Sequence, residues 1–182
     1  MPFTTLDSRT ALIVIDLQKG IAALPPPDLA RSAIANAVKL IDAFRAHKQP
    51  VVLVNVVGGA PGRADMKMGG ERPADWAELL PELRASADDI RVSKKTWGAF
   101  TGTGLDARLS DLGVTGVVVC GIATSMGVES TARFAHELGY NVTLPTDAMT
   151  DANPEAHRRS VELLFPRIAE TGTTDELLAL LK

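Results

Sequence analysis

The sequence has one cysteine, no long apolar run and little net charge, and each of these features excludes a class of protein. A single cysteine, Cys120, cannot form an internal disulfide bond and does not indicate an oxidising compartment. No apolar run approaches the roughly 18 residues of a membrane-spanning helix. The 19 Lys and Arg nearly balance the 22 Asp and Glu, which argues against nucleic acid or an anionic membrane as the main partner.

The composition is that of an ordinary globular protein. Apolar residues make up 46% of the chain and charged residues 23%, which excludes an intrinsically disordered protein. The length of 182 residues predicts a single domain over residues 1–182, which can bury a core without a disulfide or a metal. Residues 1–7 lack the positive start and apolar stretch of a secretion signal, so we expect a cytoplasmic protein.

Short apolar runs alternate with longer amphipathic segments along the chain. The runs at 11–15, 51–57, 90–92 and 117–120 are typical of buried parallel strands, with weaker candidates at 141–144 and 168–169. The intervening segments predict helices over 28–47, 103–112 and 126–138, one beginning at Asn153-Pro154, and a last one opened by a capping box of Thr173 and Glu176. Alternating strands and helices predict a three-layer α/β fold with a parallel sheet.

One stretch interrupts this alternation. Residues 58–89 are rich in glycine and proline, and a short helix is predicted around residues 76–80. A connection of this length is usually functional or a covering loop, so we expect it to lie over a functional region or at a contact with a neighbouring chain.

Three predicted strand ends carry residues suited to chemistry. Asp16 directly follows the first strand, Lys94 follows the third, and Gly121 to Gly127 connects the fourth strand to a helix. Ligands of open parallel sheets bind beyond the carboxyl ends of the strands, so these groups could meet in one pocket. Each has an ordinary alternative, because an aspartate after a strand is often a turn or cap residue and Lys94 is one of a lysine pair. The glycine segment matches neither common phosphate-binding pattern.

Histidine and cysteine give little further signal. His47, His136 and His157 have no second ligand at the spacing of a metal site, so we expect no metal and no cofactor. Cys120 belongs to a predicted buried strand, where cysteine is usually a small apolar filler.

The residues at the strand ends, taken in order, resemble the isochorismatase-like hydrolase superfamily, whose members are also called cysteine hydrolases. The resemblance extends from Thr10 to the final helix. Its motifs are Ala11-Leu-Ile-Val-Ile-Asp16-Leu-Gln18, Lys94-Lys-Thr-Trp97-Gly-Ala-Phe100 with Thr103 and Leu105, and Gly121-Ile-Ala-Thr124 followed by Val128-Glu-Ser-Thr131-Ala132. Three motifs in this order and at this spacing are far more specific than any one of them.

The resemblance implies a six-stranded parallel sheet in the order 3-2-1-4-5-6 and a site between strands one and four. In the thiol members, such as nicotinamidase and N-carbamoylsarcosine amidohydrolase, a cysteine at a helix start attacks an acyl group. Carried over to this chain, Asp16 is the acid/base residue and Lys94 is its lysine partner. Ile122-Ala123 is a cis peptide bond, and the backbone of Ala123 and Gly127 supplies the oxyanion donors. The motif residues Gln18, Trp97, Phe100 and Thr124 are expected to line the pocket.

Glycine stands where the thiol members have their nucleophile. The position between Met126 and Val128 is Gly127, and Cys120 lies before the turn, so thiol catalysis is disfavoured. Bacterial isochorismatases, which cleave a vinyl ether with an aspartate as the proposed proton donor, resemble this chain in having glycine there. The His-x-His metal segment of nicotinamidases is absent, with Asn55-Val-Val-Gly-Gly59 in its place, which argues against nicotinamidase activity.

Two functions remain open at this point. The first is hydrolysis of a small molecule without a cysteine nucleophile, with Asp16 as general acid or base beside Lys94. The second is a non-catalytic relative that binds a small anion at the helix start near Gly127 and at Lys94. Family members commonly pair through helices near strands four and five, so we expect a homo-oligomer. Ala132 and Ala135 would allow close approach of the helix over 126–138, or would only pack on their own sheet.

Overall fold

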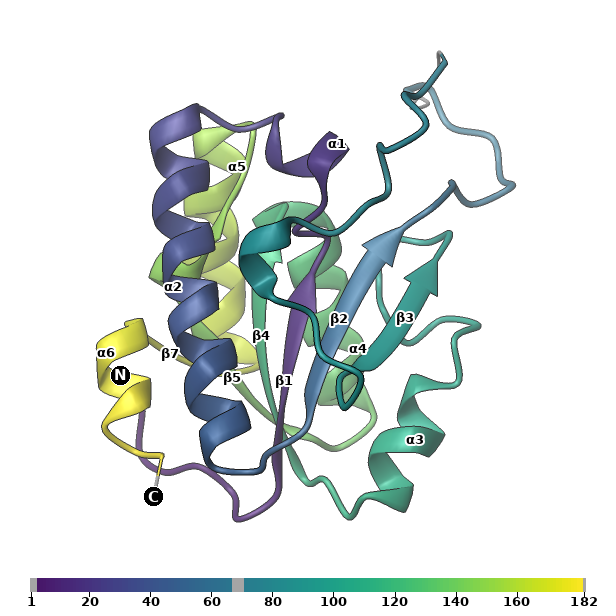
Figure 1. The fold of residues 1–182 in the computed structure, drawn as a ribbon. Coiled ribbons are helices and arrows are strands. Elements are labelled where there is room, and N and C mark those ends of the chain that lie inside the picture. The colour runs from purple at the N-terminus through teal and green to yellow at the C-terminus, as the bar shows by residue number, and fades with distance from the viewer. Residues whose placement is uncertain (1–2, 67–70, 182) are drawn as a thin grey trace.

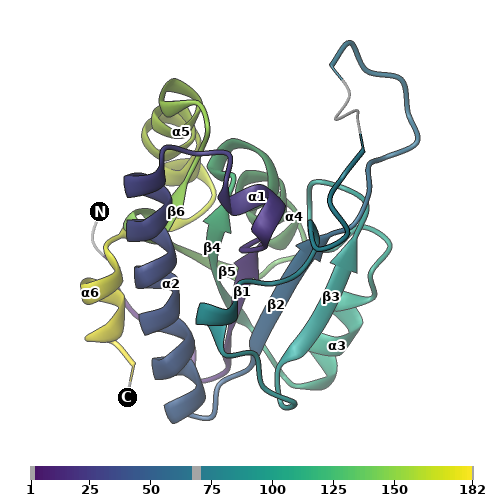
Figure 2. The same ribbon diagram turned by 45° about the horizontal axis from the view of Figure 1, so that its top comes forward.

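Alternate side chains of the first strand, β1 (Thr10–Ile15), are buried on opposite faces of the sheet. Ala11, Ile13 and Ile15 belong to one apolar cluster, whereas Leu12 and Val14 belong to a second one. Successive side chains of a strand point to opposite faces, so both faces of the sheet are covered. In the computed structural model, which describes residues 3–66 and 71–181, helices lie on both sides of the sheet (Figures 1 and 2). The predicted three-layer α/β fold is therefore confirmed.

The sheet is parallel throughout. Its other strands are β2 (Val51–Val56), β3 (Ile90–Lys94), β4 (Gly116–Ile122), β5 (Asn141–Pro145), β6 (Met149–Thr150) and β7 (Glu170–Gly172). The path runs β3-β2-β1-β4-β5-β7, and the short β6 pairs with β4 beyond the end of β5. The predicted order of six strands is confirmed, with β7 in the last place and β6 as an addition. The strand order reverses between β1 and β4.

The helices are divided between the two faces. They are α1 (Lys19–Ala22), α2 (Pro27–Ala46), α3 (Leu105–Asp111), α4 (Glu129–Glu137), α5 (Pro154–Arg159) and α6 (Thr174–Leu178). Short 3₁₀ turns are η1 (Pro81–Leu83), η3 (Thr146–Ala148) and η5 (Phe165–Arg167), and π turns are η2 (Thr124–Val128) and η4 (Ser160–Leu164). Leu40 and Phe44 of α2 pack in the cluster that contains Leu12, while Leu109 of α3 and Ala132 of α4 pack in the other. Figure 1 shows α2 in front of the sheet and α3 and α4 behind it.

The two predicted caps of the last helices are confirmed. The side chain of Asn153 accepts hydrogen bonds from the N–H groups of Glu155 and Ala156 at the start of α5. Thr173 and Glu176 form a complete capping box at the start of α6. Each cap satisfies N–H groups that the helix itself leaves unpaired.

The helix predicted around residues 76–80 is wrong. The chain instead forms a turn there, and Leu79 makes an isolated antiparallel bridge to Gln18. Leu80 is extended, with ψ of 135°, because it precedes Pro81, and a residue before proline is driven out of the helical region. Residues 67–70 of the 58–89 stretch lie outside the described residues, as do residues 1, 2 and 182 of the predicted domain.

Two element boundaries also differ from the prediction. The N–H groups of Ile168 and Ala169 both bond back to the carbonyl of Phe165, so the last strand begins only at Glu170. The helix predicted from Met126 begins earlier, as the π turn η2, in which the N–H of Val128 reaches the carbonyl of Ala123. This π turn lies directly at the predicted site.

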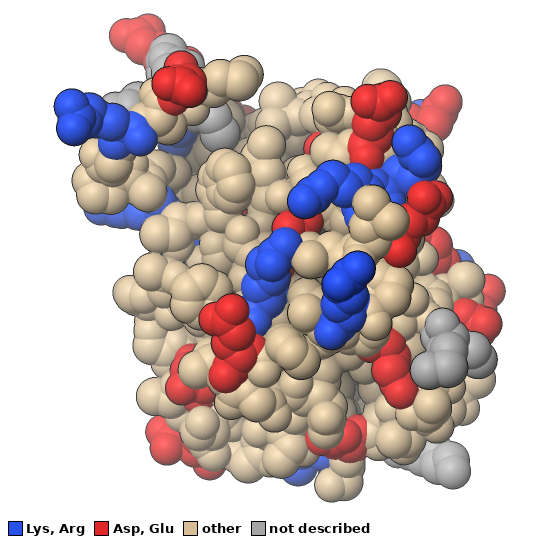
Figure 3. All heavy atoms as spheres, turned by 180° about the vertical axis from the view of Figure 1, so that it is seen from behind, with Lys and Arg blue, Asp and Glu red and all other residues tan. Residues whose placement is uncertain are grey.

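No helix in the described part of the chain is long and apolar enough to span a membrane. On the face shown in Figure 3, the described Lys and Arg side chains lie among Asp and Glu, with uncharged surface between them. This face therefore has no broad patch of a single sign.

Gly121 allows β1 and β4 to approach each other, and this predicts a large effect of substitution. Its φ is +118°, and a Cβ there would overlap the carbonyl oxygen of Ile15. Gly121→Ala should lower the free energy of unfolding by at least about 3 kcal/mol in urea denaturation. Gly113→Ala is the matched control, since Gly113 has φ of +68° but open space around it; it should cost only about 1–2 kcal/mol. Equal losses for both variants would contradict the prediction.

Candidate active site

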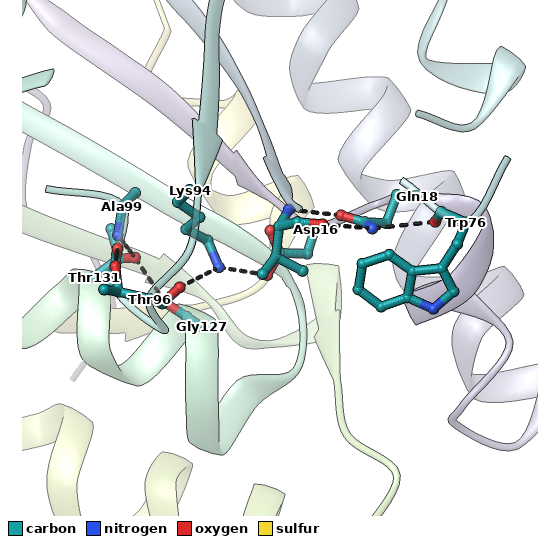
Figure 4. Close-up of polar contacts among 10 residues, drawn as sticks. Asp16, Gln18, Trp76, Lys94, Thr96, Ala99, Gly127 and Thr131 are labelled. Carbon is teal, nitrogen blue, oxygen red and sulfur yellow. Dashed lines mark hydrogen bonds and ion pairs between the residues drawn. The ribbon is translucent and has the colours of Figure 1, made fainter. Parts of the chain in front are cut away.

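Asp16 and Lys94 form a buried ion pair at the carboxyl ends of β1 and β3. Lys94 Nζ lies 2.7 Å from Asp16 Oδ2, and the two side chains are only 1% and 7% exposed. The lysine also donates to the carbonyl of Thr96 at 3.1 Å (Figure 4). Because β2 lies between β3 and β1, the long lysine side chain has to pass the end of β2 to reach the aspartate. The structure therefore brings together the first two predicted site residues.

The backbone turns sharply at Asp16. Its φ is +51°, a left-handed conformation that aspartate tolerates better than most residues. The Asp16 N–H still bonds to Val54 in the sheet, while its carbonyl accepts from the N–H of Gln18 in the tight turn that follows. This turn ends β1 and leaves the carboxylate at the edge of the sheet, facing Lys94.

Burial governs the protonation of Asp16. It raises the pKa of the carboxyl from 3.8 to about 6, and the opposing charge and hydrogen bond of Lys94 only partly offset it. Oδ2 is engaged by Lys94, but the buried Oδ1 has no hydrogen-bond partner among the described residues. Buried polar atoms are nearly always paired, so Oδ1 is a free acceptor available to a bound molecule.

Gly127 lies beside this carboxylate. A Cβ at Gly127 would be 3.3 Å from Asp16 Oδ2 and 3.5 Å from the carbonyl of Trp97. It would also be 2.7 Å from the Ile15 side-chain methyl Cγ2, a distance that requires Ile15 to move. The carbonyl of Gly127 accepts from the hydroxyl of Thr131, which in turn accepts from the N–H of Ala99. The site thus joins the ends of β1, β3 and β4.

The connection between β4 and α4 has an unusual backbone. The peptide bond between Ile122 and Ala123 is cis, at the position for which the resemblance predicts it. The π turn η2 follows at once, and the carbonyl of Ala123 accepts from the N–H groups of both Met126 and Val128. Gly127 is therefore carried by a wide π turn rather than by a regular α-helix.

The four predicted pocket residues have different roles. Gln18 is fully buried, and its side chain hydrogen-bonds to the backbone of both Val56 and Trp76. It therefore ties the segment around Trp76 to the end of β2. Trp97 is 63% exposed. Phe100 packs in the core and stacks on Tyr140 with ring centroids 6.0 Å apart. The need for a large apolar side chain at position 100 of the motif is thus explained by packing in the core.

Thr124 is buried as well, but its hydroxyl does not serve as a free pocket group. It lies 2.8 Å from Nδ1 of His157 on α5. The N–H and hydroxyl of the next residue, Ser125, both donate to Asp151 at 2.8 Å. Sequence reasoning missed Asp151 and assigned His157 no role. The one local signal that could have pointed to Asp151 is its place two residues before the helix cap Asn153. Its carboxylate accepts a hydrogen bond from the N–H of Asn153.

Two surface hollows among the described residues lie away from Asp16. One of about 310 Å³ is lined by Asp7, Asn141 and Glu170, and another of about 440 Å³ by Arg9, Arg45 and Asp89. Both lie at the amino ends of the strands. Asp7 and Glu170 in the first hollow are already hydrogen-bonded to the protein's own groups, as is Asp89 in the second. In the described part of the chain, no three His, Cys, Asp or Glu side chains are arranged to hold a metal ion.

Comparison with known proteins agrees with this geometry. The pattern of the Isochorismatase domain family matches residues 10–176. The chain belongs to the isochorismatase family. The isochorismatase family protein YwoC of Bacillus subtilis (strain 168) is 45% identical over 96% of this chain and 95% of its own length. The structure of an isochorismatase family protein from Burkholderia thailandensis, 36% identical, superposes with a TM-score of 0.92 and covers 99% of this chain and 98% of that one.

The isochorismatase family is a family of hydrolases. The ureidoacrylate amidohydrolase RutB of Rhizobium rhizogenes (strain K84 / ATCC BAA-868) is 30% identical over 85% of this chain and 75% of its own length. This member of the family therefore has the fold of enzymes that cleave small molecules with water.

The buried pair predicts a large cost for removing its cation. Lys94→Met leaves the carboxylate of Asp16 buried and unpaired, which should lower the free energy of unfolding at neutral pH by roughly 3–5 kcal/mol. Without Lys94 the pKa of Asp16 rises above about 6, so the loss should shrink as the pH falls toward 6, because the variant protonates its buried carboxyl at a higher pH than the wild type does. Urea denaturation at several pH values measures both effects.

Lys19→Met is the matched control for this measurement. Lys19 also pairs with two carboxylates, Asp75 and Glu78, but its side chain is 42% exposed. Exposed ion pairs contribute little to stability, so this variant should lose much less than Lys94→Met. A loss as large as that of Lys94→Met would show that the burial of the Asp16 pair is not what makes it important.

Proposed function

We propose that this chain hydrolyses a small molecule without a cysteine nucleophile, with Asp16 as the general acid or base and Lys94 as its partner. The observation that carries the proposal is the buried carboxylate of Asp16 beside Gly127, which is held through Oδ2 and leaves Oδ1 unpaired. Hydrolysis adds a proton to one side of the scissile bond and hydroxide to the other. A carboxyl group that can both take and give a proton is suited to this reaction.

The pKa of Asp16 supports this role. At about 6 it lies close to neutrality, so both protonation states are accessible under ordinary conditions. Lys94 prevents burial from raising this pKa further, and it fixes the direction in which Oδ1 faces. A proton held at Oδ1 can be donated to a leaving oxygen or nitrogen, and an ionised Oδ1 can accept one from water.

The surroundings of Gly127 support water, rather than a side chain, as the nucleophile. Glycine has no group that can attack, and the Ile15 methyl occupies part of the space that a side chain at this position would need. Cys120 is fully buried, and burial raises its pKa to about 12, so its thiolate is inaccessible at neutral pH. We assign the backbone N–H groups of Ala123 and Gly127 as the donors to developing negative charge, and the exposed Trp97 as a substrate contact.

Non-catalytic anion binding is less well supported. The N–H of Ser125 at the start of η2 is already bonded to the Asp151 carboxylate, and Lys94 is already paired with Asp16. The carboxylates of Asp151 and Asp16 are thus already bound to the N–H and the ammonium group that an anion would need. Binding without turnover remains the alternative outcome of the test below.

A panel of small esters, amides and vinyl ethers tests the proposal. We expect wild-type protein to hydrolyse at least one class, and Asp16→Asn to lower kcat/KM by about 10²–10⁴-fold, since proton transfer contributes a factor of this size. The rate should change with pH around 6, in step with the titration of Asp16. Amides belong in the panel because RutB, a relative, is an amidohydrolase. Absence of turnover across the panel, with binding of a carboxylate or phosphate compound, would favour the alternative.

Cys120→Ser is the matched control for this experiment. The variant should keep the activity, and wild-type activity should survive iodoacetamide, because the thiol is buried away from the site and is not part of the proposed mechanism. A modest loss of stability, about 1–2 kcal/mol, is expected from placing a hydroxyl in the core. Loss of activity on alkylation, with the fold intact, would refute the proposal.

We further propose that the chain forms a homo-oligomer. Ala132 and Ala135 are fully buried within the chain's own core, so they do not supply the contact. The exposed apolar side chains of Met126, Phe134 and Leu138 lie at helical spacing along η2 and α4 and offer a contact surface instead.

Light scattering should therefore show a dimer or a larger species at micromolar concentration. Phe134→Glu should shift it toward monomer, whereas Leu112→Glu, a change of an exposed apolar residue at the end of α3 near Arg9, should not. A wild-type monomer at this concentration would refute the prediction.

A further inference from the structure

The π turn η2 carries Gly127, and side chains from one later segment hold it in place. This segment, residues 151–160, begins after β6 and continues through α5 into the second π turn, η4. π turns inside helices frequently occur at functional sites, where they place a backbone group that a regular helix would not. The side chains that hold η2 in place therefore help to determine the geometry of the site.

Two of these contacts join an ionised group to a donor. Asp151 Oδ2 accepts from both the N–H and the hydroxyl of Ser125 at 2.8 Å. Glu129 Oε2, at the start of α4, accepts from the hydroxyl of Ser160 at 2.6 Å. Asp151 and Glu129 are both largely buried. These two contacts hold the second residue of the turn and the first residue beyond it.

The third contact is different, because its partner is a histidine. Nδ1 of His157 lies 2.8 Å from the hydroxyl oxygen of Thr124, the first residue of the turn, whose side chain is fully buried. A neutral imidazole can accept the threonine proton at Nδ1. A protonated imidazole carries hydrogen on both nitrogens and can only donate, so Thr124 then needs another acceptor for its own proton. No other partner of this hydroxyl is found among the described residues.

We propose that His157 is a positioning residue for the turn Thr124–Val128: as neutral imidazole it accepts from Thr124, and its protonation reverses this hydrogen bond, deprives the Thr124 proton of its acceptor and shifts the backbone that carries Gly127. Among the described residues, the side-chain hydrogen bond of His157 goes to Thr124 and not to Asp16 or Gly127, so in this proposal it acts through Thr124. The effect on the backbone is independent of the hydrolytic function proposed above, and only its consequence for turnover rests on that function.

The charges around His157 favour the neutral form near pH 7. Burial lowers the pKa of His157 below 6.5, and the nearby carboxylate of Asp151 opposes this effect. The other charges on its helix are paired or far more exposed: Arg158 is 3.7 Å from Glu162, Arg159 is 3.9 Å from Glu129, and Glu155 is at the exposed start of α5. The Thr124 hydroxyl thus donates to His157 at neutral pH, and its proton loses this acceptor in mild acid.

Backbone ¹⁵N–¹H NMR of the whole chain tests this without any substrate. As the pH falls from neutral, the amide signals of Thr124 to Val128 should shift with the same apparent pKa as the His157 ring. In His157→Asn, an amide oxygen can occupy roughly the place of Nδ1 and cannot be protonated, so these shifts should disappear. His47→Asn, at the exposed end of α2, is the matched control and should leave them unchanged.

Two further variants separate positioning from general stability. Thr124→Val removes the hydroxyl at nearly constant shape and should abolish the coupled shifts, while Thr124→Ser should restore them. If the panel of esters, amides and vinyl ethers yields turnover, Thr124→Val should lower kcat by about tenfold with little change in KM. In the pH–rate profile, His157→Asn should remove a fall in rate toward acid pH that is separate from the one caused by Asp16.

The outcomes separate the two proposals. If no compound is hydrolysed, the proposed function fails while the amide titration still decides the role of His157. If turnover is found but the η2 amides do not follow His157, or still titrate in His157→Asn, the positioning role is overturned and the proposed function stands.

Discussion

The buried pair of Lys94 and Asp16 is the interaction on which the rest of the site depends. It requires three parallel strands to end at the same edge, because the lysine comes from β3 and reaches past β2 to the end of β1. It also determines what the carboxylate can do, since it engages one oxygen and leaves the other unpaired. Removing two charges from water is costly, so a pair this deeply buried needs a tightly packed surrounding.

The site combines a charged half and a backbone half. β1 and β3 supply the charges, and the turn after β4 supplies closely packed backbone in place of side chains. Gly121 lets that turn start against Ile15, and Gly127 lets it pass the carboxylate of Asp16. The backbone half is not self-supporting, because Thr124, Ser125 and Glu129 each bond to a residue of the later segment 151–160.

Glycine at position 127 distinguishes this site from one built around a thiol. The space for a side chain is partly occupied by the methyl of Ile15, so a nucleophile there would require repacking as well as a substitution. Asp16 and Lys94 nevertheless form their buried pair in the structure. The proposed hydrolysis with water as the attacking group rests on this combination.

Much of the fold could be predicted from local patterns. The apolar runs predicted the six main strands, although the last one lies at Glu170–Gly172 rather than at 168–169. Asn153 and the Thr173–Glu176 pair predicted the starts of two helices. The helix predicted at 76–80 failed because Pro81 holds Leu80 extended, a local effect that the apolar pattern did not take into account. The motifs likewise pointed to Asp16, Lys94 and Gly127 as a group.

Tertiary structure alone decided how these residues and their supports meet. Thr124 and His157 are 33 positions apart, and Asp16 and Lys94 are 78 apart, so their contacts follow from strand order and helix packing rather than from spacing. Phe100 shows the converse, since its motif position suggested the pocket but its ring fills the core against Tyr140. By itself the sequence determined the strand pattern, the helix caps and the types of group at the strand ends, because these depend on neighbouring residues. Burial, the raised pKa of Asp16 and its unpaired oxygen arise from atoms brought together across the whole chain, and only the folded structure could decide them.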